Sequence, residues 1–493
     1  ELTMKTNTLD FDAQALRDRI LDLAMRGKLV PQDPNDEPAS VLLEKIKVEK
    51  AELVKEKKIK KSKPLPPITD DEKPFDIPDS WEWVRLGDVF DITSSKRVMK
   101  KEWKDSGIPF YRAREIVSIK RNRPLKDPIY IDKKTYSEKI KVSGKPREND
   151  ILLTGVGTLG IPYIVPKDKE FYFKDGNIIW LKNFGKVNSN FISYYVQSPY
   201  MLKMINNGRG TTVATLTIIR SEKLLVPLPP LSEQSRIAAK IAQLFALLRK
   251  VESSTQQYAK LQTLLKSKVL DLAMRGKLVK QDPNDEPASE LLKKIKAEKA
   301  ELIKEKKIKK SKPLPPITDD EKPFDIPDSW EWVRLGEITK KITDGTHNPP
   351  PNAHLGKQII SAVNIKNGKI DFKLSDRFVT NLQFEKEDKR THIRRGDILF
   401  TIVGSLGNAA IVETDKMFTA QRSVAIINSD LPSKYLYYSL ISKMFQEQIF
   451  NNAKGTTQKG IYLKKLSGLV LPLPPLKEQG RIVNKINKLS KIM

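Results

Sequence analysis

The sequence predicts an α/β (α+β) protein in which long coiled-coil helices separate two mixed α/β domains. The main observation is a pseudo-twofold internal duplication, because residues 21–87 recur at 270–336 with 62 identities in 67 positions. A second observation is that the segments between the repeats, about 80–228 and 329–473, diverge almost completely. The pattern indicates a near-identical helical frame that carries two different domains.

Weaker echoes continue the repeat inside and after the divergent segments. Ile-Leu-Leu-Thr at 151–154 matches Ile-Leu-Phe-Thr at 398–401, Gly-Thr-Thr occurs at 210 and 455, and Pro-Leu-Pro-Pro-Leu-x-Glu-Gln starts at 227 and 472. The two divergent segments are therefore expected to be versions of one domain. Short β-rich runs broken by Gly, Asn and Pro predict a mixed α/β fold, with helix near 191–206 and 433–450.

The longest predicted helix follows Pro230. Ser232 is a suitable N-cap, and Glu233 suits the positive end of the helix dipole. The apolar positions then step by four and three, which is the 3.5-residue period of a coiled-coil seam. The predicted packing residues of this helix are Ile237, Ile241, Leu244, Leu248, Val251, Leu265, Val269 and Leu272. A single long helix lying on one globular core is the alternative.

The partner of this helix is expected to be split between the chain ends, so that the halves are circularly related. Residues 477–493 match 232–248, and residues 4–30 match 253–279. Pairing would bury the apolar stripes of the two short terminal helices, neither of which is long enough to be stable alone. The stripes comprise Leu16, Ile20 and Leu23 at the N-terminus and Ile482, Ile486 and Leu489 at the C-terminus.

A Lys-rich stretch and a Pro-rich connector precede each domain. The stretch is predicted to be helical over 42–61 and 291–310, and it is a solvated face, a phosphate-contacting arm or a subunit-docking arm. Prolines then favour an extended connector, which ends at the Trp-x-Trp-Val-Arg-Leu strands that begin at 81 and 330. The expected division is 1–79 (helical), 80–230 (first domain), 231–328 (central helices and connector), 329–475 (second domain) and 476–493 (terminal helix).

Composition restricts the function. The 493 residues include 89 Lys and Arg against 61 Asp and Glu, a formal net charge of +28, which favours a polyanionic partner and nucleic acid first. The absence of cysteine excludes disulfides, thiolate zinc sites and a cysteine nucleophile, and three histidines leave little material for a metal site. With no apolar run long enough to span a membrane and no signal-peptide pattern, we expect a cytoplasmic protein.

Two motifs imitate catalytic sites. Gly155-Val-Gly-Thr-Leu-Gly160 is a literal GxGxxG, but Ile161-Pro-Tyr-Ile-Val-Pro follows it where a dinucleotide fold needs a helix, so we predict a hairpin turn. Asn348-Pro-Pro-Pro351 is similar to the Asn-Pro-Pro-aromatic loop of amino-methyltransferases, but Pro351 cannot stack on a flipped base. The sequence therefore predicts no catalytic residue and no metal site.

The motifs together resemble the specificity subunit (S subunit) of type I restriction-modification systems over nearly the whole chain. They are the two Trp-x-Trp-Val-x-Leu-Gly starts, Gly396-Asp-Ile-Leu-Phe-Thr with Gly404-Ser-Leu-Gly407, Gly455-Thr-Thr-Gln458 and the paired Pro-Pro-Leu-x-Glu-Gln segments. The resemblance implies two target-recognition domains, each of which reads one half of a bipartite, asymmetric site in double-stranded DNA. Residues 1–78 and the Lys/Pro insertion at 280–327 depart from the simplest layout of the family.

The resemblance also implies the partners. Two methyltransferase subunits dock on the helices and restriction subunits join them, so this chain is expected to be a non-catalytic subunit without its own cofactor. S-adenosylmethionine, ATP and Mg belong to the partner subunits. The alternatives are the targeting subunit of a methylation-only complex, a stand-alone double-domain DNA-binding regulator, and a scaffold that binds an acidic protein.

Candidate DNA-contacting residues are polar side chains on loops rich in Gly and Pro. In the first domain they are Lys96, Arg97, Arg112, Arg114, Arg209, Thr211 and Thr212. In the second domain they are Thr343, Asp344, Thr346, His347, Asn348, Lys454, Thr456, Thr457 and Gln458. The alternative role of each is to satisfy the backbone of its own turn. Because Gly-Thr-Thr recurs in both halves, it is better suited to phosphate contact or folding than to base reading.

Overall fold

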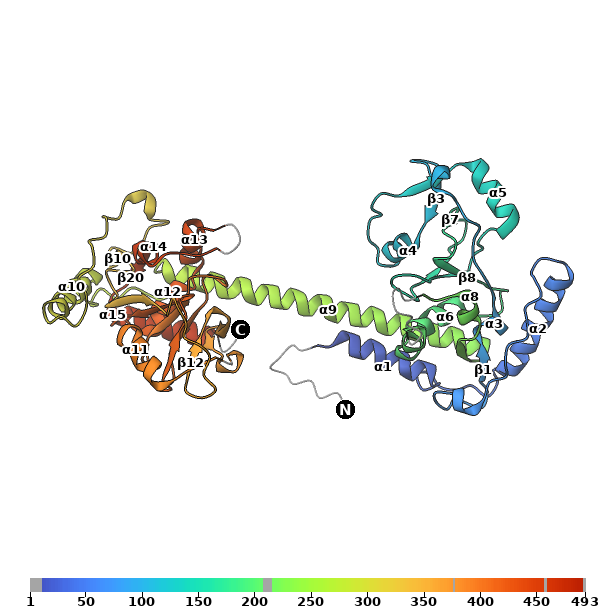
Figure 1. The fold of residues 1–493 in the computed structure, drawn as a ribbon, viewed down its shortest axis with the longest axis horizontal. Helices are drawn as coiled ribbons and strands as arrows, with labels where there is room; N and C mark the ends of the chain where they lie inside the picture. Colours follow the sequence, from blue (N-terminus) through green and yellow to red (C-terminus); the bar gives the residue numbers. More distant parts are fainter. Residues whose placement is uncertain (1–10, 207–214, 376, 456–458, 491–493) are drawn as a thin grey trace. The chain divides into compact units, whose positions relative to one another are not determined.

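The computed structural model describes residues 11–206, 215–375, 377–455 and 459–490. The chain divides into two compact units, Glu1–Gln256 and Gln257–Met493. The helix α9 (Leu231–Met274) begins in the first unit and ends in the second (Figure 1). Each unit therefore contains one divergent domain together with part of the frame. The finer five-segment division stays a prediction.

The two divergent domains have the same sheet topology. In unit 1 a four-stranded antiparallel sheet has the order β2-β8-β5-β6, and in unit 2 the order β11-β19-β16-β17 is equivalent. The strands are β2 (Asp91–Thr93), β8 (Ile178–Lys182), β5 (Ile151–Thr154) and β6 (Pro162–Ile164), and then β11 (Lys341–Asp344), β19 (Val424–Asn428), β16 (Ile398–Thr401) and β17 (Ala409–Ile411).

A smaller sheet accompanies each of them, again with one topology. The central strand β3 pairs in parallel with β7 and antiparallel with β4, as β12 does with β18 and β15. These strands are β3 (Ile108–Tyr111), β4 (Ile129–Ile131), β7 (Tyr172–Phe173), β12 (Lys357–Ile360), β15 (Phe378–Val379) and β18 (Phe418–Ala420). The predicted relationship between the divergent segments is therefore confirmed at the level of fold.

The uninterrupted apolar runs at 151 and 398 become strands that are buried on both faces. In β5 all four residues are buried; Ile151 and Leu153 enter the core shared with the helices, and Leu152 enters the core under the smaller sheet. β16 divides its side chains in the same way. This burial explains why the runs lack the alternation of a half-exposed strand.

Each domain is closed by its own first and last strands. β1 (Glu82–Arg85) pairs antiparallel with β9 (Leu225–Leu228), and β10 (Glu331–Arg334) pairs with β20 (Val470–Leu473). The predicted Trp-x-Trp strand is confirmed, but its alternation is wrong, since Trp81 is buried just before the strand whereas Trp83 is only partly buried. The pairing brings the end of each domain back to its start, where the frame helices α9 and α15 (Leu476–Ser490) begin.

The frame helix packs on a terminal helix in each unit. Figure 1 shows α1 (Ala13–Met25) alongside the first part of α9 and running in the opposite direction. Leu21 and Met25 share a core with Ile237 and Ile241, and Arg17 forms an ion pair with Glu252. In unit 2, α15 packs on the last turns of α9 through apolar side chains, namely Ile482 and Ile486 with Val269, Ala273 and Met274.

The structure corrects the predicted seam in part. Val251 and Leu265 are exposed at 41% and 49%, so the prediction that they pack is wrong for the described chain. The described α1 starts only at Ala13 and α15 ends at Ser490, which leaves the middle of α9 without a described neighbour. Seven further predicted packing residues are only partly buried, namely Leu16, Ile20, Leu23, Leu244, Leu248, Leu272 and Leu489.

The Lys-rich helices are shorter than predicted. They are α2 (Ala39–Lys55) and α10 (Ala288–Lys304), and each ends where a lysine takes a left-handed conformation, Lys57 and Lys306 at φ +59°. The Lys58 amide then donates to the Leu53 carbonyl at 2.9 Å, which closes the helix end.

The Pro-rich connector is fixed on its domain by hydrogen bonds. The buried guanidinium of Arg85 donates to the carbonyls of Pro66 and Pro67.

The remaining helices lie on the sheets of the two domains. The predicted helical stretches near 191–206 and 433–450 are confirmed, each as a pair of short helices. The helices are α3 (Leu86–Val89), α4 (Ala113–Lys120), α5 (Lys133–Ser143), α6 (Ser189–Val196), α7 (Pro199–Asn206), α8 (Ile218–Glu222), α11 (Asn381–Thr391), α12 (Ser433–Leu440), α13 (Lys443–Asn452) and α14 (Leu463–Gly468). Within the described ranges, no helix has the length and hydropathy of a membrane span.

Candidate nucleic-acid interface

Strand register brings several loops of unit 1 to one edge of its larger sheet. The last residue of β2, Thr93, pairs with Trp180 in the middle of β8, and the last residue of β5, Thr154, pairs with Ile178, the first residue of β8. Because these pairs are antiparallel, the loop after β2, the loop before β8 and the β5–β6 hairpin leave the sheet on the same side. We call this side of the larger sheet, with its three loops, the reading edge of unit 1. It contains Lys96 and Arg97, two of the DNA-contacting candidates predicted from the sequence.

The β5–β6 hairpin contains the GxGxxG motif, and the prediction of a turn is confirmed. Gly157 and Gly160 have φ of +78° and +72°, a conformation that favours glycine, and the Gly160 amide donates to the Thr154 carbonyl. β6 follows directly and pairs with β5. The glycines therefore shape a hairpin at the reading edge and do not cradle a pyrophosphate.

Unit 2 has an equivalent reading edge. Asp344 ends β11 opposite Ala425, and Thr401 ends β16 opposite Val424. The Asp344 carboxylate lies 2.8 Å from His347 Nε2 and accepts from Arg390 Nη1 at 3.1 Å. Arg390 comes from α11, so this small polar cluster joins the loop after β11 to a helix.

The other sequence candidates of unit 2 differ in accessibility. Thr346 is buried, with its amide bonded to the Ala420 carbonyl, and Thr343 is paired within β11, so the structure weighs against direct base contact by these two. His347 and Asn348 are exposed on the loop. Lys454 is also exposed, and it bridges to Gly460, which itself bridges to Val403 on the β16–β17 hairpin. The reading edge thus gathers His347, Asn348 and Lys454.

In unit 1 the structure separates the candidate arginines and lysines into two groups. Lys96 is exposed, and Arg97 is 75% exposed with a single ion pair to Asp175 at 3.2 Å. The Arg112 guanidinium is instead only 18% exposed, because it forms two hydrogen bonds with the buried Glu115, at 2.9 and 2.6 Å. This engagement of its guanidinium weighs against a direct base contact by Arg112.

Arg114 has the same structural task. Its guanidinium binds Glu115 at 2.7 Å and donates to the carbonyls of Lys126 and Asp127. Burial would raise the pKa of Glu115, but the hydrogen bonds from Arg112 and Arg114 outweigh it and lower that pKa. The two arginines stabilise a buried carboxylate and the loop beyond α4, and Arg114, which is 54% exposed, keeps one side open.

Two residues of the reading edge were not among the candidates predicted from the sequence. Arg390 approaches it from α11, and the exposed Arg422 lies in the loop before β19, where its amide donates to the Thr346 carbonyl. Within the described ranges the Arg422 guanidinium has no partner. The available signal was position, since Arg422 lies two residues before the buried strand β19. Arg209, Thr211, Thr212, Thr456, Thr457 and Gln458 lie outside the described residues.

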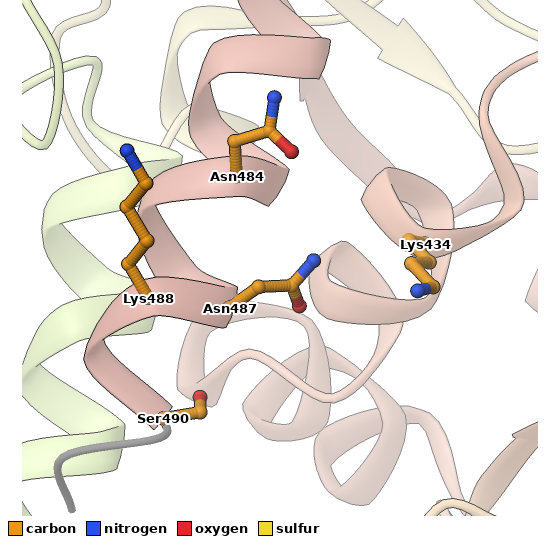
Figure 2. Close-up of a pocket in the computed structure, with 5 residues that line it drawn as sticks. All are labelled: Lys434, Asn484, Asn487, Lys488 and Ser490. Atoms are coloured by element: carbon orange, nitrogen blue, oxygen red, sulfur yellow. The ribbon is translucent and has the colours of Figure 1, made fainter.

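A surface cavity of unit 2 is lined by polar side chains. About 670 Å³ lies between α12 and α15, lined by Lys434, Asn484, Asn487, Lys488 and Ser490. Figure 2 shows Asn487 reaching toward Lys434, whereas Lys488 points away from it. The lining consists of amides, ammonium groups and one hydroxyl, with neither a carboxylate nor a histidine among its five residues. Within the described ranges, no group of three histidines or acids is placed to hold a metal ion.

A duplicated fold that presents two different polar edges on one repeated frame defines a bivalent recognition protein. Comparison with known proteins identifies which kind. The chain belongs to the family of the type I restriction modification DNA specificity domain, whose model matches residues 78–262 and 327–493. Members of this family are the DNA-recognition subunits of type I restriction enzymes.

Individual relatives agree with the family assignment. The chain is 33% identical to the specificity subunit of the type I restriction enzyme EcoAI from Escherichia coli, over 97% of this chain and 89% of that one. It is 31% identical to the EcoEI specificity subunit from the same organism, over 98% and 90%. A chain from a solved type I restriction-modification complex has the same fold, with a TM-score of 0.54 at 19% identity over 85% of this chain and 92% of that one.

Proposed function

We propose that each reading edge recognises one half of a bipartite, asymmetric sequence in double-stranded DNA, and that the frame helices set the spacing between the halves. The frame also docks two methyltransferase subunits, to which restriction subunits are added. S-adenosylmethionine, ATP and Mg are bound by those partners. The relatives are named as specificity subunits of type I restriction enzymes, and a specificity subunit implies other subunits in the enzyme, which supports the proposal.

One observation carries the proposal: two domains whose larger and smaller sheets share one topology place loops of different sequence at the same edge. After β2 the chain passes through Lys96 and Arg97 to a short 3-10 turn at Lys100–Glu102, whereas after β11 it passes through His347 and Asn348 to β12 without such a turn in the described residues. A shared framework with different loops lets each domain specify its own bases while both keep one mode of approach. Arg422 adds a guanidinium of the kind that reads guanine in the major groove.

Phosphate contacts supply the second part of DNA binding. Lys96 and Lys454 are exposed lysines on the two edges, and a lysine can bind phosphate as a point charge without reading the base. Each such contact releases a condensed counterion, so affinity falls steeply with salt. We assign the arginine and amide side chains to base contact and these lysines to register and affinity.

The middle of α9 supports subunit docking. Several apolar side chains there are between 41% and 56% exposed, namely Leu247, Val251, Tyr258, Leu261, Leu264 and Leu265. Their spacing of three and four residues forms a stripe along the helix, which suits an apolar helix of a partner. Water exposure of such a stripe is unfavourable, and docking of a methyltransferase subunit would cover it.

The test is a domain exchange followed by methylation mapping. The chain is co-expressed with the methyltransferase encoded beside it, and methylated adenines are mapped across the host genome. Replacing residues 80–228 with the corresponding segment of another family member should change one half of the target and keep the other half. If both halves change together, or neither does, the two domains are not independent readers.

A further inference from the structure

The first turn of α9 is held by polar side chains that DNA reading does not use. Glu233 is 1% exposed, and its Oε2 accepts from Trp81 Nε1 at 2.8 Å while its Oε1 accepts from Gln32 Nε2 at 2.5 Å. We call Trp81, Glu233 and Gln32 the helix lock of unit 1. The two donors offset part of the desolvation of this carboxylate, although burial still raises the pKa of Glu233.

Unit 2 contains the same lock. Glu478 is 1% exposed and accepts from Trp330 Nε1 at 2.9 Å and from Gln281 Nε2 at 2.6 Å. The lock thus recurs with nearly the same distances beneath two domains of different sequence. This recurrence assigns it to the frame, which both units share, and not to the recognition of particular bases.

Neighbouring contacts hold the same helix turn from other directions. Gln234, which is fully buried, accepts from the Asn188 amide at 2.9 Å and donates to the Pro229 carbonyl at 2.8 Å. Arg236 pairs with Asp36 at 2.6 Å. Successive helix residues point about 100° apart, so contacts through 233, 234 and 236 grip the turn from different sides. Such a turn cannot tilt without breaking a buried hydrogen bond.

We propose that the helix lock positions each frame helix relative to its domain and so determines which spacing between half-sites the protein accepts. This inference rests on the proposed function. A helix of 44 residues is about 66 Å long at about 1.5 Å per residue. A tilt of about 5° at one end moves the other end by about 6 Å, close to the rise of two base pairs at about 3.4 Å each. A small change in the direction of the helix therefore causes a large change in the distance between the half-sites that the protein accepts.

Hydrogen bonds suit this task better than apolar contacts. The Trp81 ring already packs edge-on to Phe191, with ring centres 6.5 Å apart. That contact stabilises the turn but tolerates sliding, because dispersion depends weakly on orientation. The indole N–H bond to Glu233 is directional and weakens steeply when its angle changes. Trp81 and Glu233 are positioning residues, since neither lies at the reading edge.

The experiment removes the N–H donor but keeps an aromatic ring. The full chain carrying Trp81→Phe is purified with its methyltransferase subunits, and its binding is measured on duplexes with the mapped target and the spacer at native length or altered by one or two base pairs. Trp83→Phe is the matched control, because it makes the same chemical change two residues away at a partly buried ring that packs on Phe75. The exposed Gln32→Ala variant weakens the lock without altering the core.

The expected result is a fall of about tenfold in the preference of Trp81→Phe for the native spacer over a spacer longer or shorter by one base pair. Discrimination against single-base changes within each half-site should not move. Gln32→Ala should shift spacer preference in the same direction by less, and Trp83→Phe should behave as the parent. If Trp81→Phe keeps the parent's spacer preference, or if Trp83→Phe loses as much of that preference as Trp81→Phe, the proposed positioning role of the helix lock is wrong. A parent complex that recognises no bipartite target contradicts the proposed function instead.

Discussion

Gln234 accepts a hydrogen bond from the backbone amide of Asn188 at 2.9 Å, and this bond ties the start of α9 to the first turn of α6. In unit 2 the corresponding residues are Gln479 and Pro432, the N-cap residue of α12. Proline has no amide hydrogen to donate. Gln479 Oε1 is accordingly buried without a hydrogen-bond partner among the described residues. One of two otherwise equivalent joints is therefore left incomplete.

The substitution Pro432→Asn should supply the missing hydrogen bond to Gln479 Oε1 in unit 2. Asparagine restores the amide donor, and its side chain can cap α12 as Asn188 caps α6. Satisfying one buried acceptor should stabilise unit 2 by about 1 kcal/mol. Hydrogen exchange of α12 and α15 amides measures the change, and Asn188→Pro should produce the opposite change in unit 1. Faster exchange in Pro432→Asn would contradict the account.

The corrected seam predicts a contrast within α9. Ile241 is fully buried against α1, so Ile241→Ala should cost about 2–5 kcal/mol as a core truncation. Val251→Ala should change the isolated chain by less than about 0.5 kcal/mol, because that side chain is 41% exposed. Thermal unfolding of the two variants checks this. A large loss in Val251→Ala would show that a neighbour covers the middle of the helix in solution.

Comparison of the sequence-based predictions with the structure shows which features local patterns can predict. The repeat, the strand positions and the hairpin at Gly155–Gly160 follow from local patterns, and the structure confirms them. Burial along α9 does not follow, because the heptad pattern is the same whether a partner helix comes from this chain or from another protein. The pattern therefore predicts an apolar stripe through Val251 and Leu265, but the prediction that these side chains pack within this chain is wrong for the described residues.

The candidate site was less predictable, because side-chain roles depend on distant partners. Arg112 resembled a base reader, yet Glu115 lies three residues later and accepts from both its backbone amide and its guanidinium, and this local Arg-x-x-Glu spacing was an available signal. Arg390 and Arg422 reach the reading edge only through tertiary structure, from α11 and from the loop before β19. No spacing in the sequence joins them to His347.

Acid should release the Pro-rich connector of unit 2. Hydrogen bonds from Arg334 lower the pKa of Glu321 to about 2, below its usual value near 4.5. A lowered carboxylate pKa stabilises the folded state above the unfolded value, and this contribution is lost as pH falls from about 4.5 toward 2. Glu321→Gln should therefore speed hydrogen exchange in residues 313–321 at pH 7, with the difference from the parent shrinking below pH 4.5. A difference that grows on acidification would have the wrong sign.

Arg422 and Arg112 should separate reading from folding. Arg422 is exposed at the reading edge, so Arg422→Ala should cost about 1–3 kcal/mol of binding if it contacts a base, relax one position of the target and leave thermal stability unchanged. Arg112→Ala removes two hydrogen bonds from the buried Glu115, so its main effect should be a lower unfolding temperature of unit 1. Methylation mapping and calorimetry on both variants measure the two effects. Relaxed specificity in Arg112→Ala at unchanged stability would return that arginine to the base-contacting set, and unchanged specificity and salt dependence in Arg422→Ala would remove Arg422 from the reading edge.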